Sequence, residues 1–426
     1  MADERHTLVV VNPGHFHAAL TLRLPHPRLR EDVHVYAEDG PDLERFVEIV
    51  AAFNTRAVAP TRWKLHVHRG ADYLQRLLRE QPGRLAVVAG RNDHKMALIA
   101  ALHQAGFLVL GDKPWTIEPG QLDALRATCA AGPLAMDIMT ERHEVSVRLL
   151  KALMQSEAVF GAPRGSAAAP ALSLRSVHHL YKLVNGRPLV RPAWYFDVGV
   201  QGEGITDVNT HLVDLVQWML GDGQPPYDFE RDVALLAARQ WPTSVPRDLF
   251  CRITGLDDFP APLRASVNDA ALHYLCNASI AYRLRGVPVE IEALWDLAIP
   301  AGGGDTHCFR VRGTRADLAV RLDATTAFRT ELTVAPLQAG GYGKALSAAL
   351  ASLQVDFPGV AAHETTAGFR IHIPDALRTT HEEHFAVVLD EFIACADTGY
   401  APDNVAPDLV AKYTLLQRAL VLSHTG

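Results

Sequence analysis

Residues 85–114 read LAVVAGRNDHKMALIAALHQAGFLVLGDKP, and this stretch carries the clearest fold signal in the chain. Its first residues, 85–90, form an apolar run closed by glycine, which is typical of a central parallel strand. A helical stretch follows over 94–105 and ends at Gly106, and a second apolar strand is expected over 107–110. A strand, a helix and a strand in such close succession predict one unit of a parallel α/β sheet.

The same alternation of strand and helix patterns fills the rest of the first 140 residues. Strands are expected over 8–11, 33–37, 85–90, 107–110 and 134–139, and helices over 18–22, 43–53, 94–105 and 121–130. This rhythm predicts a doubly wound parallel sheet of the Rossmann kind in a domain spanning residues 1–140.

The pattern changes after residue 140, which predicts a second domain over 141–426. A helix is expected over 142–155, and the expected strands, joined by glycine or proline turns, cover 172–178, 272–283, 287–294, 308–311 and 318–322. Amphipathic helices over 383–396 and 407–422 close the chain and could return to the first domain. The proline-rich segment 224–265 shows weak periodicity and is left unassigned. An α+β domain with a large, mostly antiparallel sheet is therefore expected.

Net charge and cysteine spacing argue against some classes of function. The chain has 426 residues, a formal net charge of −7 and no basic block, so nucleic acid is not an expected partner. Its five cysteines form no CxxC pair, which argues against a disulfide framework or structural zinc. No signal peptide and no membrane span are recognised, and a cytoplasmic location is expected.

The turn after the first strand reads Asn12-Pro13-Gly14-His15-Phe16-His17 and is the candidate dinucleotide loop. Only the middle glycine of the G-x-G-x-x-G pattern is present, as Gly14. Asn12 can adopt the left-handed conformation that the first glycine often supplies, whereas His17 stands where a glycine would allow close packing. A turn without a ligand is an equally acceptable interpretation of this stretch, and His15 to His17 could instead line a substrate pocket.

Acidic and polar residues follow two further expected strands. Glu38 or Asp39 ends the second strand, where a carboxylate binds the adenosine ribose and repels a 2′-phosphate, so NAD is expected rather than NADP. Arg91, Asn92 and His94 follow the strand over 85–90, at the edge where such sheets bind ligands. Local turn or helix capping could account for each of them as well.

Two segments hold the catalytic candidates. Lys113 follows a strand and is fixed by Pro114, so it could stabilise a developing alkoxide. Asp207, His211 and Asp214 are spaced four and three apart and would share one face of a helix. Taken alone, Lys113 is better explained by a surface turn, and the D-x-x-x-H-x-x-D spacing by an amphipathic helix with a satisfied polar face.

Together these segments resemble the Gfo/Idh/MocA oxidoreductases. The stretch 105–114, ending in Asp112-Lys113-Pro114, is similar to the family's strand ending in Glu-Lys-Pro, with Asp112 in place of glutamate. The glycine-rich D-x-x-x-H-x-x-D segment over 202–221 resembles the second signature, and residues 308–322 resemble the strand pair of the substrate domain.

The resemblance implies a nicotinamide cofactor, a large open sheet and a homo-oligomer, either a dimer or a tetramer. It further implies that Lys113 polarises a substrate hydroxyl and contributes with Asp112 to the cofactor site. His211 would be the general base or its proton relay, and Asp207 would orient the site. Asp214 is expected to be structural.

A carbohydrate or polyol is the expected substrate, because aromatic and polar residues precede and occupy the catalytic segment. The candidate substrate residues are Tyr181, Trp194, Asp197, Asn209 and Thr210. No metal site is expected, since His381 and His384 are three residues apart and do not form an HExxH motif.

Three functions are compatible with the sequence. The first is an NAD-dependent dehydrogenase of a sugar, sugar acid or cyclitol. The second is glycoside cleavage through transient oxidation and elimination with bound NAD. The third is a non-catalytic NAD or sugar sensor, which the incomplete glycine fingerprint favours and the retained Lys113, Asp207 and His211 oppose.

Overall fold

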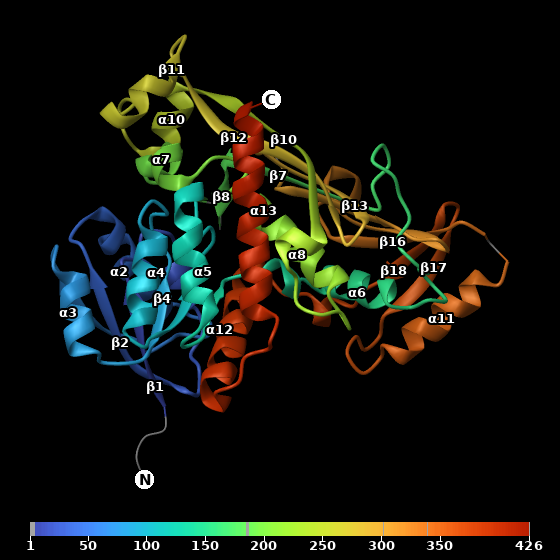
Figure 1. Cartoon of the computed structure of the whole chain (residues 1–426), viewed down its shortest axis with the longest axis horizontal. Helices are drawn as coiled ribbons and strands as arrows, with labels where there is room; N and C mark the ends of the chain where they lie inside the picture. Colours follow the sequence, from blue (N-terminus) through green and yellow to red (C-terminus); the bar gives the residue numbers. More distant parts are fainter. Residues whose placement is uncertain (1–4, 185–186, 301, 339, 426) are drawn as a thin grey trace.

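The computed structural model describes residues 5–184, 187–300, 302–338 and 340–425, which fold around two sheets (Figure 1). The first sheet is six-stranded and parallel, in the order β3-β2-β1-β4-β5-β6. Its strands are β1 (His6–Val11), β2 (Leu29–Ala37), β3 (Lys64–Arg69), β4 (Leu85–Val88), β5 (Leu108–Gly111) and β6 (Ala135–Asp137). The order reverses between β1 and β4, which confirms the predicted doubly wound sheet.

Helices connect these strands: α1 (His17–Leu20), α2 (Pro41–Thr55), α3 (Tyr73–Glu80), α4 (Lys95–Gln104) and α5 (Leu122–Ala130). Because the sheet is covered on both faces, the last four residues of β1 are fully buried. Helix α1 has only four residues, so the helix expected over 18–22 is shorter and begins at His17.

The second sheet has ten strands and is mostly antiparallel, as predicted; within it β7 and β13 pair in parallel. Its order is β10 (Val233–Pro246), β12 (Ala271–Leu284), β13 (Val287–Ala298), β7 (Leu172–Tyr181), β14 (Thr306–Arg312), β15 (Ala316–Leu322), β16 (Glu331–Pro336), β18 (Gly368–His372) and β17 (Ala361–Thr365), and β11 (Val267–Asn268) pairs with β12. A separate short pair joins β8 (Leu183–Val184) to β9 (Arg187–Pro188).

The helices of this second half are α6 (Val145–Met154), α7 (Val198–Gln201), α8 (Asn209–Leu220), α9 (Phe229–Asp232), α10 (Arg247–Thr254), α11 (Tyr342–Ser352), α12 (His381–Thr398) and α13 (Val405–Thr425). Asp207 lies in the turn before α8, so it does not share a helical face with His211 and Asp214 as the spacing suggested.

The last two helices return to the parallel sheet. Helix α12 adds Phe385, Val388, Leu389, Phe392 and Ile393 to the core on one face of that sheet. Helix α13 runs between the two sheets and contacts α5, α8 and β10 (Figure 1). Among the described residues, no helix has the length and apolar composition needed to cross a membrane.

Candidate active site

The turns after β1 and β4 form a compact cradle at the carboxyl edge of the parallel sheet. The backbone amides of Gly14 and His15 both donate to the carbonyl of Ala89, over 3.0 and 3.1 Å. Asn12 has a φ of 44°, the left-handed conformation that its position in the fingerprint predicted. A Cβ on Gly90 would lie 2.3 Å from the Asn12 carbonyl oxygen, so only glycine fits there. This cradle lies at the switch point of the sheet, where α/β folds bind ligands.

Two histidines of the β1–α1 turn converge on one carboxylate. His15 Nδ1 lies 3.0 Å from Asp112 Oδ2, and His17 Nδ1 lies 3.0 Å from Asp112 Oδ1. Phe16 packs against both imidazole rings. Burial lowers the pKa of both histidines. Burial alone would raise the pKa of Asp112, but the two imidazoles hold it well below its usual range. The carboxylate is therefore ionised and both rings are neutral at neutral pH.

The two acidic residues at the end of β2 have different surroundings. Asp39 Oδ1 accepts a hydrogen bond from Arg69 Nη1 over 2.7 Å, and Arg69 also pairs with Glu44. Glu38 is exposed, and its carboxylate makes no hydrogen bond or ion pair with another described residue. Glu38 is thus the carboxylate that is available to a ribose hydroxyl.

The turn after β4 contacts the segment that precedes helix α8. Arg91 Nε lies 3.3 Å from Asp42 Oδ2, and Trp194 Nε1 donates to the same oxygen over 3.0 Å. Asn92 Nδ2 donates to the backbone carbonyl of Gln201 over 2.7 Å. The Arg91 guanidinium also lies over the Trp194 ring, 5.7 Å from its centroid, so Arg91, Asn92 and Trp194 connect the two halves of the molecule beside the cradle. Asp42 is a member of this contact that the sequence did not identify.

Four other predicted site residues lie apart from the cradle or are engaged in local contacts. The His94 side chain is 67% exposed at the start of α4. The Tyr181 ring lies under an arginine guanidinium, 4.5 Å from its centroid. Asp197 accepts a backbone amide of α7 as its N-cap, and the buried Thr210 hydroxyl donates to a carbonyl one turn earlier.

Lys113 and Asp207 meet, although they are far apart in the sequence. Lys113 Nζ donates to Asp207 Oδ1 over 2.6 Å, and the two side chains are 11% and 5% exposed. Burial would raise the pKa of Asp207, but the ammonium group of Lys113 keeps it below its ordinary value. Asp207 Oδ2 has no hydrogen-bond partner within the described structure. This ion pair joins the end of β5 to the turn before α8 and leaves an acceptor that a ligand could use.

Further unpaired polar atoms follow on α8. His211 Nδ1 is buried without a partner, and burial together with the charge of Lys113 lowers the pKa of His211 to about 4. Two carboxylates, Glu141 and Asp214, lie near His211. Because Nδ1 has no partner, neither of them fixes the tautomer of His211 through this nitrogen. Asn209 is fully buried, and both polar atoms of its amide lack partners within the described chain. Unpaired buried groups of this kind are uncommon and point to a ligand or bound water.

Asp214 belongs to a buried ion network. Arg142 donates to both of its oxygens over 2.5 Å, and Lys412 Nζ donates to Oδ1 over 2.8 Å. The ammonium group of Lys412 also lies 2.8 Å from Asp137 Oδ2. Burial opposes ionisation of Asp214, but the two cations hold its pKa far below normal. Its contacts fit the structural role that was expected for it.

One carboxylate among histidines was not identified from the sequence. Glu141 interacts electrostatically with His381, His211, His307 and His384, and these groups lower its pKa to about 2 although burial alone would raise it. Glu141 Oε1 lies 3.5 Å from His381 Nδ1. These residues come from the 3-10 turn Glu141–His143 after β6, and from α8, β14 and α12, so no local spacing could reveal the cluster.

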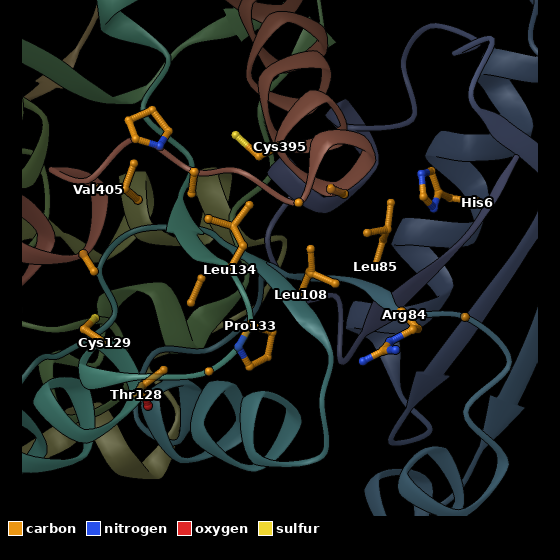
Figure 2. Close-up of a pocket in the computed structure, with 18 of the residues that line it drawn as sticks. His6, Arg84, Leu85, Leu108, Thr128, Cys129, Pro133, Leu134, Cys395 and Val405 are labelled. Atoms are coloured by element: carbon orange, nitrogen blue, oxygen red, sulfur yellow. The ribbon is translucent and has the colours of Figure 1, made fainter. Parts of the chain in front are cut away.

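A cavity of about 900 Å³ lies at the opposite edge of the parallel sheet (Figure 2). His6, Leu85, Leu108 and Leu134 line it from the amino ends of β1, β4, β5 and β6, and Cys395 lines it from α12. The cradle and Lys113 are at the carboxyl ends of the same strands. This cavity is therefore separate from the candidate active site.

Comparisons with known proteins agree with this architecture. The family model described as "Putative oxidoreductase C terminal domain" matches residues 149–424. The crystal structure of an oxidoreductase from Parabacteroides merdae ATCC 43184 is 37% identical, with a TM-score of 0.96, over 99% of this chain and 98% of that one. A search of curated proteins gave no match.

More distant solved structures share the fold. Levoglucosan dehydrogenase in complex with NADH and levoglucosan is 15% identical, with a TM-score of 0.63, over 98% of this chain and 97% of that one. A 3-ketoreductase from Actinomadura kijaniata, in complex with TDP-benzene and NADP, is 14% identical, with a TM-score of 0.58, over 98% of each chain. The extent of the family match and the identity to the Parabacteroides structure show that the chain belongs to this family and is an oxidoreductase of the Gfo/Idh/MocA type.

Proposed function

We propose that the protein is an NAD-dependent oxidoreductase that transfers a hydride between nicotinamide and a hydroxyl-bearing carbon of a sugar, sugar acid or cyclitol. The observation that carries this proposal is the buried Lys113–Asp207 ion pair, with His211 in electrostatic reach of Lys113. The NADH and levoglucosan bound to levoglucosan dehydrogenase, and the NADP bound to the 3-ketoreductase, support the same chemistry. The homodimer or homotetramer implied by the resemblance is part of this proposal, and light scattering in solution tests it.

Each catalytic residue has a role that follows from its surroundings. The Lys113 ammonium group donates a hydrogen bond to the reacting oxygen and stabilises negative charge that develops there. Asp207 accepts a hydrogen bond from the Lys113 ammonium group and holds it in place. His211 is neutral near pH 7, so it can accept the hydroxyl proton directly or through a water molecule. Bound nicotinamide supplies the hydride acceptor or donor.

The cradle suits a dinucleotide. The left-handed Asn12 and the close packing of Gly14 against Gly90 bring the turns after β1 and β4 together at the switch point of the sheet. The exposed Glu38 would accept the ribose hydroxyls and repel a 2′-phosphate, because Arg69 is already paired with Asp39. We therefore propose NAD rather than NADP as the cofactor.

A screen of sugars and polyols with NAD and NADP, followed by absorbance of the reduced nicotinamide, tests the proposal. With the best substrate, Lys113→Ala and His211→Ala should each lower kcat by about 100-fold or more. Lys64→Ala removes an exposed lysine on β3 and should leave kcat unchanged. Near-normal turnover of both site variants, with an intact circular dichroism spectrum, would reject these roles.

Glu141 supports a second candidate function, glycoside cleavage with bound NAD. A ring ketone formed by oxidation acidifies the neighbouring C–H bond, so a second acid–base group could then drive elimination of the glycosidic substituent. The imidazoles of His307 and His384 beside Glu141, whose pKa values burial lowers to about 4, are such groups. Water would add to the alkene and the hydride would return to the ketone, with no net redox change. Many turnovers of a glycoside without added cofactor would favour this function, whereas stoichiometric NADH would favour the first.

A further inference from the structure

We propose that His15, His17 and Asp112 bind a divalent transition-metal ion. One nitrogen of each imidazole and one oxygen of the carboxylate all lie within 4.8 Å of one another. Each imidazole Nδ1 is 3.0 Å from the carboxylate. Ligands about 2.1 Å from a common ion are roughly 3 to 3.5 Å apart, so small side-chain shifts would place all three donors around one ion.

The chemistry of the donor set selects the class of ion. Two imidazoles and one carboxylate suit zinc, iron, manganese or cobalt rather than calcium or magnesium, which prefer oxygen ligands. Three protein ligands leave at least one coordination position for water or another molecule.

The origin of the three residues is a second, independent argument. His17 stands where the dinucleotide fingerprint has its third glycine, His15 occupies a variable position of the same turn, and Asp112 replaces the glutamate of Glu-Lys-Pro. These departures lie almost a hundred positions apart, yet their side chains meet. A dinucleotide loop has no need of two imidazoles, whereas a metal site needs all three groups.

The surroundings hold the donors in fixed positions. The two backbone hydrogen bonds to Ala89 anchor the turn, and Phe385 of α12 packs on the His17 ring with the centroids 4.6 Å apart. Asp112 is only 2% exposed, so its carboxylate cannot turn out to solvent. Preorganised ligands of this kind lower the cost of binding an ion.

Nearby charges indicate what would complete the coordination. Lys95 and Lys113 face the triad, and Lys95 Nζ donates to the backbone carbonyl of Asp112 over 3.0 Å. The carboxylates of Asp112 and Asp207 balance these two ammonium groups. A divalent ion would therefore add two uncompensated positive charges, and we expect its open position to hold an anion such as hydroxide or an ionised substrate group.

Cobalt binding to the full-length protein tests the site directly. The purified protein is stripped with a chelator, dialysed and titrated with Co²⁺, with detection by visible absorption and calorimetry. One equivalent should bind, with a spectrum of mixed nitrogen and oxygen ligation, and Zn²⁺ should displace it. This readout needs neither substrate nor NAD, so it is independent of the proposed hydride transfer.

Two variants and a control separate the metal site from a purely hydrogen-bonded triad. Asp112→Asn keeps a hydrogen-bond acceptor but removes the anionic ligand, and His17→Ala removes an imidazole. Each should weaken Co²⁺ binding by about 100-fold or more. His34→Ala, in the separate stacked cluster of His34 and His68, should bind Co²⁺ like the unmodified protein.

Three results would overturn the proposal: no stoichiometric binding by the unmodified protein, equal binding by folded Asp112→Asn, or loss of binding in His34→Ala alone. Thermal unfolding of each variant establishes that it is folded. NAD binding by the metal-free protein, measured by calorimetry, shows whether the cofactor proposal holds by itself.

Discussion

Opposing influences determine the pKa of His211. Burial is the largest influence and lowers the pKa, and the positive charge of Lys113 and the neighbouring His381 lower it further. Glu141 and Asp214 act in the opposite direction, and the resulting pKa is about 4. The imidazole is therefore ready to accept a proton at any pH well above 4.

This balance predicts the acid side of the pH–rate profile and the effect of Glu141→Gln. With the substrate identified by the screen, kcat/KM should be level from neutral pH to about pH 5 and should fall at lower pH as His211 becomes protonated. Glu141→Gln removes an anion that raises the pKa of His211, so the fall should move to lower pH by up to about one unit.

Initial rates across this pH range, with folding checked at each pH, provide the measurement. Glu157→Gln removes an exposed carboxylate outside the cluster and serves as the control. An acid limb that stays in place or moves to higher pH in Glu141→Gln would contradict the electrostatic role of Glu141.

The site residues that the sequence identified are those that follow strands or sit in recognisable spacings. Lys113 and Asp207 were predicted to share a cleft, and their side chains are 2.6 Å apart. Glu141, His307 and His381 were not predicted to meet, because they come from three separate elements and depend on tertiary packing alone. Asp42 was missed for the same reason.

At the scale of elements, helix α8 is held by charge as well as by packing. Arg142 precedes α6, Asp214 lies on α8 and Lys412 lies on α13, and their ion network connects these parts to Asp137 at the end of β6. The buried Asp214 carboxylate balances the charges of Arg142 and Lys412. Because Lys412 also pairs with Asp137, the network links α8 and α13 to the parallel sheet.

Asp214→Ala should therefore destabilise the protein strongly. Removing the carboxylate takes away the acceptor of Arg142 and leaves Lys412 paired with Asp137 alone. Loss of one partner of a buried pair costs about 3 to 5 kcal/mol. Asp123→Ala, which breaks an exposed pair with Arg126 on α5, should cost less than about 1 kcal/mol. Free energies of unfolding in urea give both values, and similar costs for the two variants would show that the network contributes little.

The elements missed from the sequence lie mostly at sheet edges. β3 reads KLHVHR and gains its place by pairing with β2 at one edge of the parallel sheet. β10, a strand of fourteen residues within the unassigned segment 224–265, pairs only with β12 in the described part of its sheet. Edge strands carry polar residues on one or both faces, so their hydrophobic pattern is weak.

At the scale of the molecule, the order of the parallel strands was predictable because alternating strands and helices allow few right-handed arrangements. The contacts between the two halves could not be predicted from the sequence. They depend on the return of α12 and α13 to the parallel sheet and on side chains such as Asn92 and Trp194. The packing of the two halves buries many titratable histidines, and their burial determines how the stability of the protein depends on pH.

Stability should therefore fall between pH 6.5 and about pH 4. Burial lowers the pKa to about 4 for His143, His211, His307 and His384. In this range the unfolded chain binds protons that the folded chain excludes, so the free energy of unfolding decreases as the pH falls. Each such histidine contributes roughly 1 kcal/mol per pH unit below 6.5. Burial raises the pKa of Asp137, Glu144 and Glu391, so these carboxyl groups increase the free energy of unfolding as the pH falls. Their contribution is smaller than that of the histidines because fewer groups are involved.

Urea unfolding at steps from pH 7.5 to pH 5 measures this slope. The variant His384→Asn should have a shallower slope, since it loses one of the four groups that take up a proton on unfolding. His66 is exposed and paired with Asp32 on the edge of the parallel sheet, so His66→Asn should leave the slope close to that of the unmodified protein. A free energy of unfolding that does not change across this range would mean that these histidines keep ordinary pKa values in the folded protein, which would contradict the lowered pKa of His211.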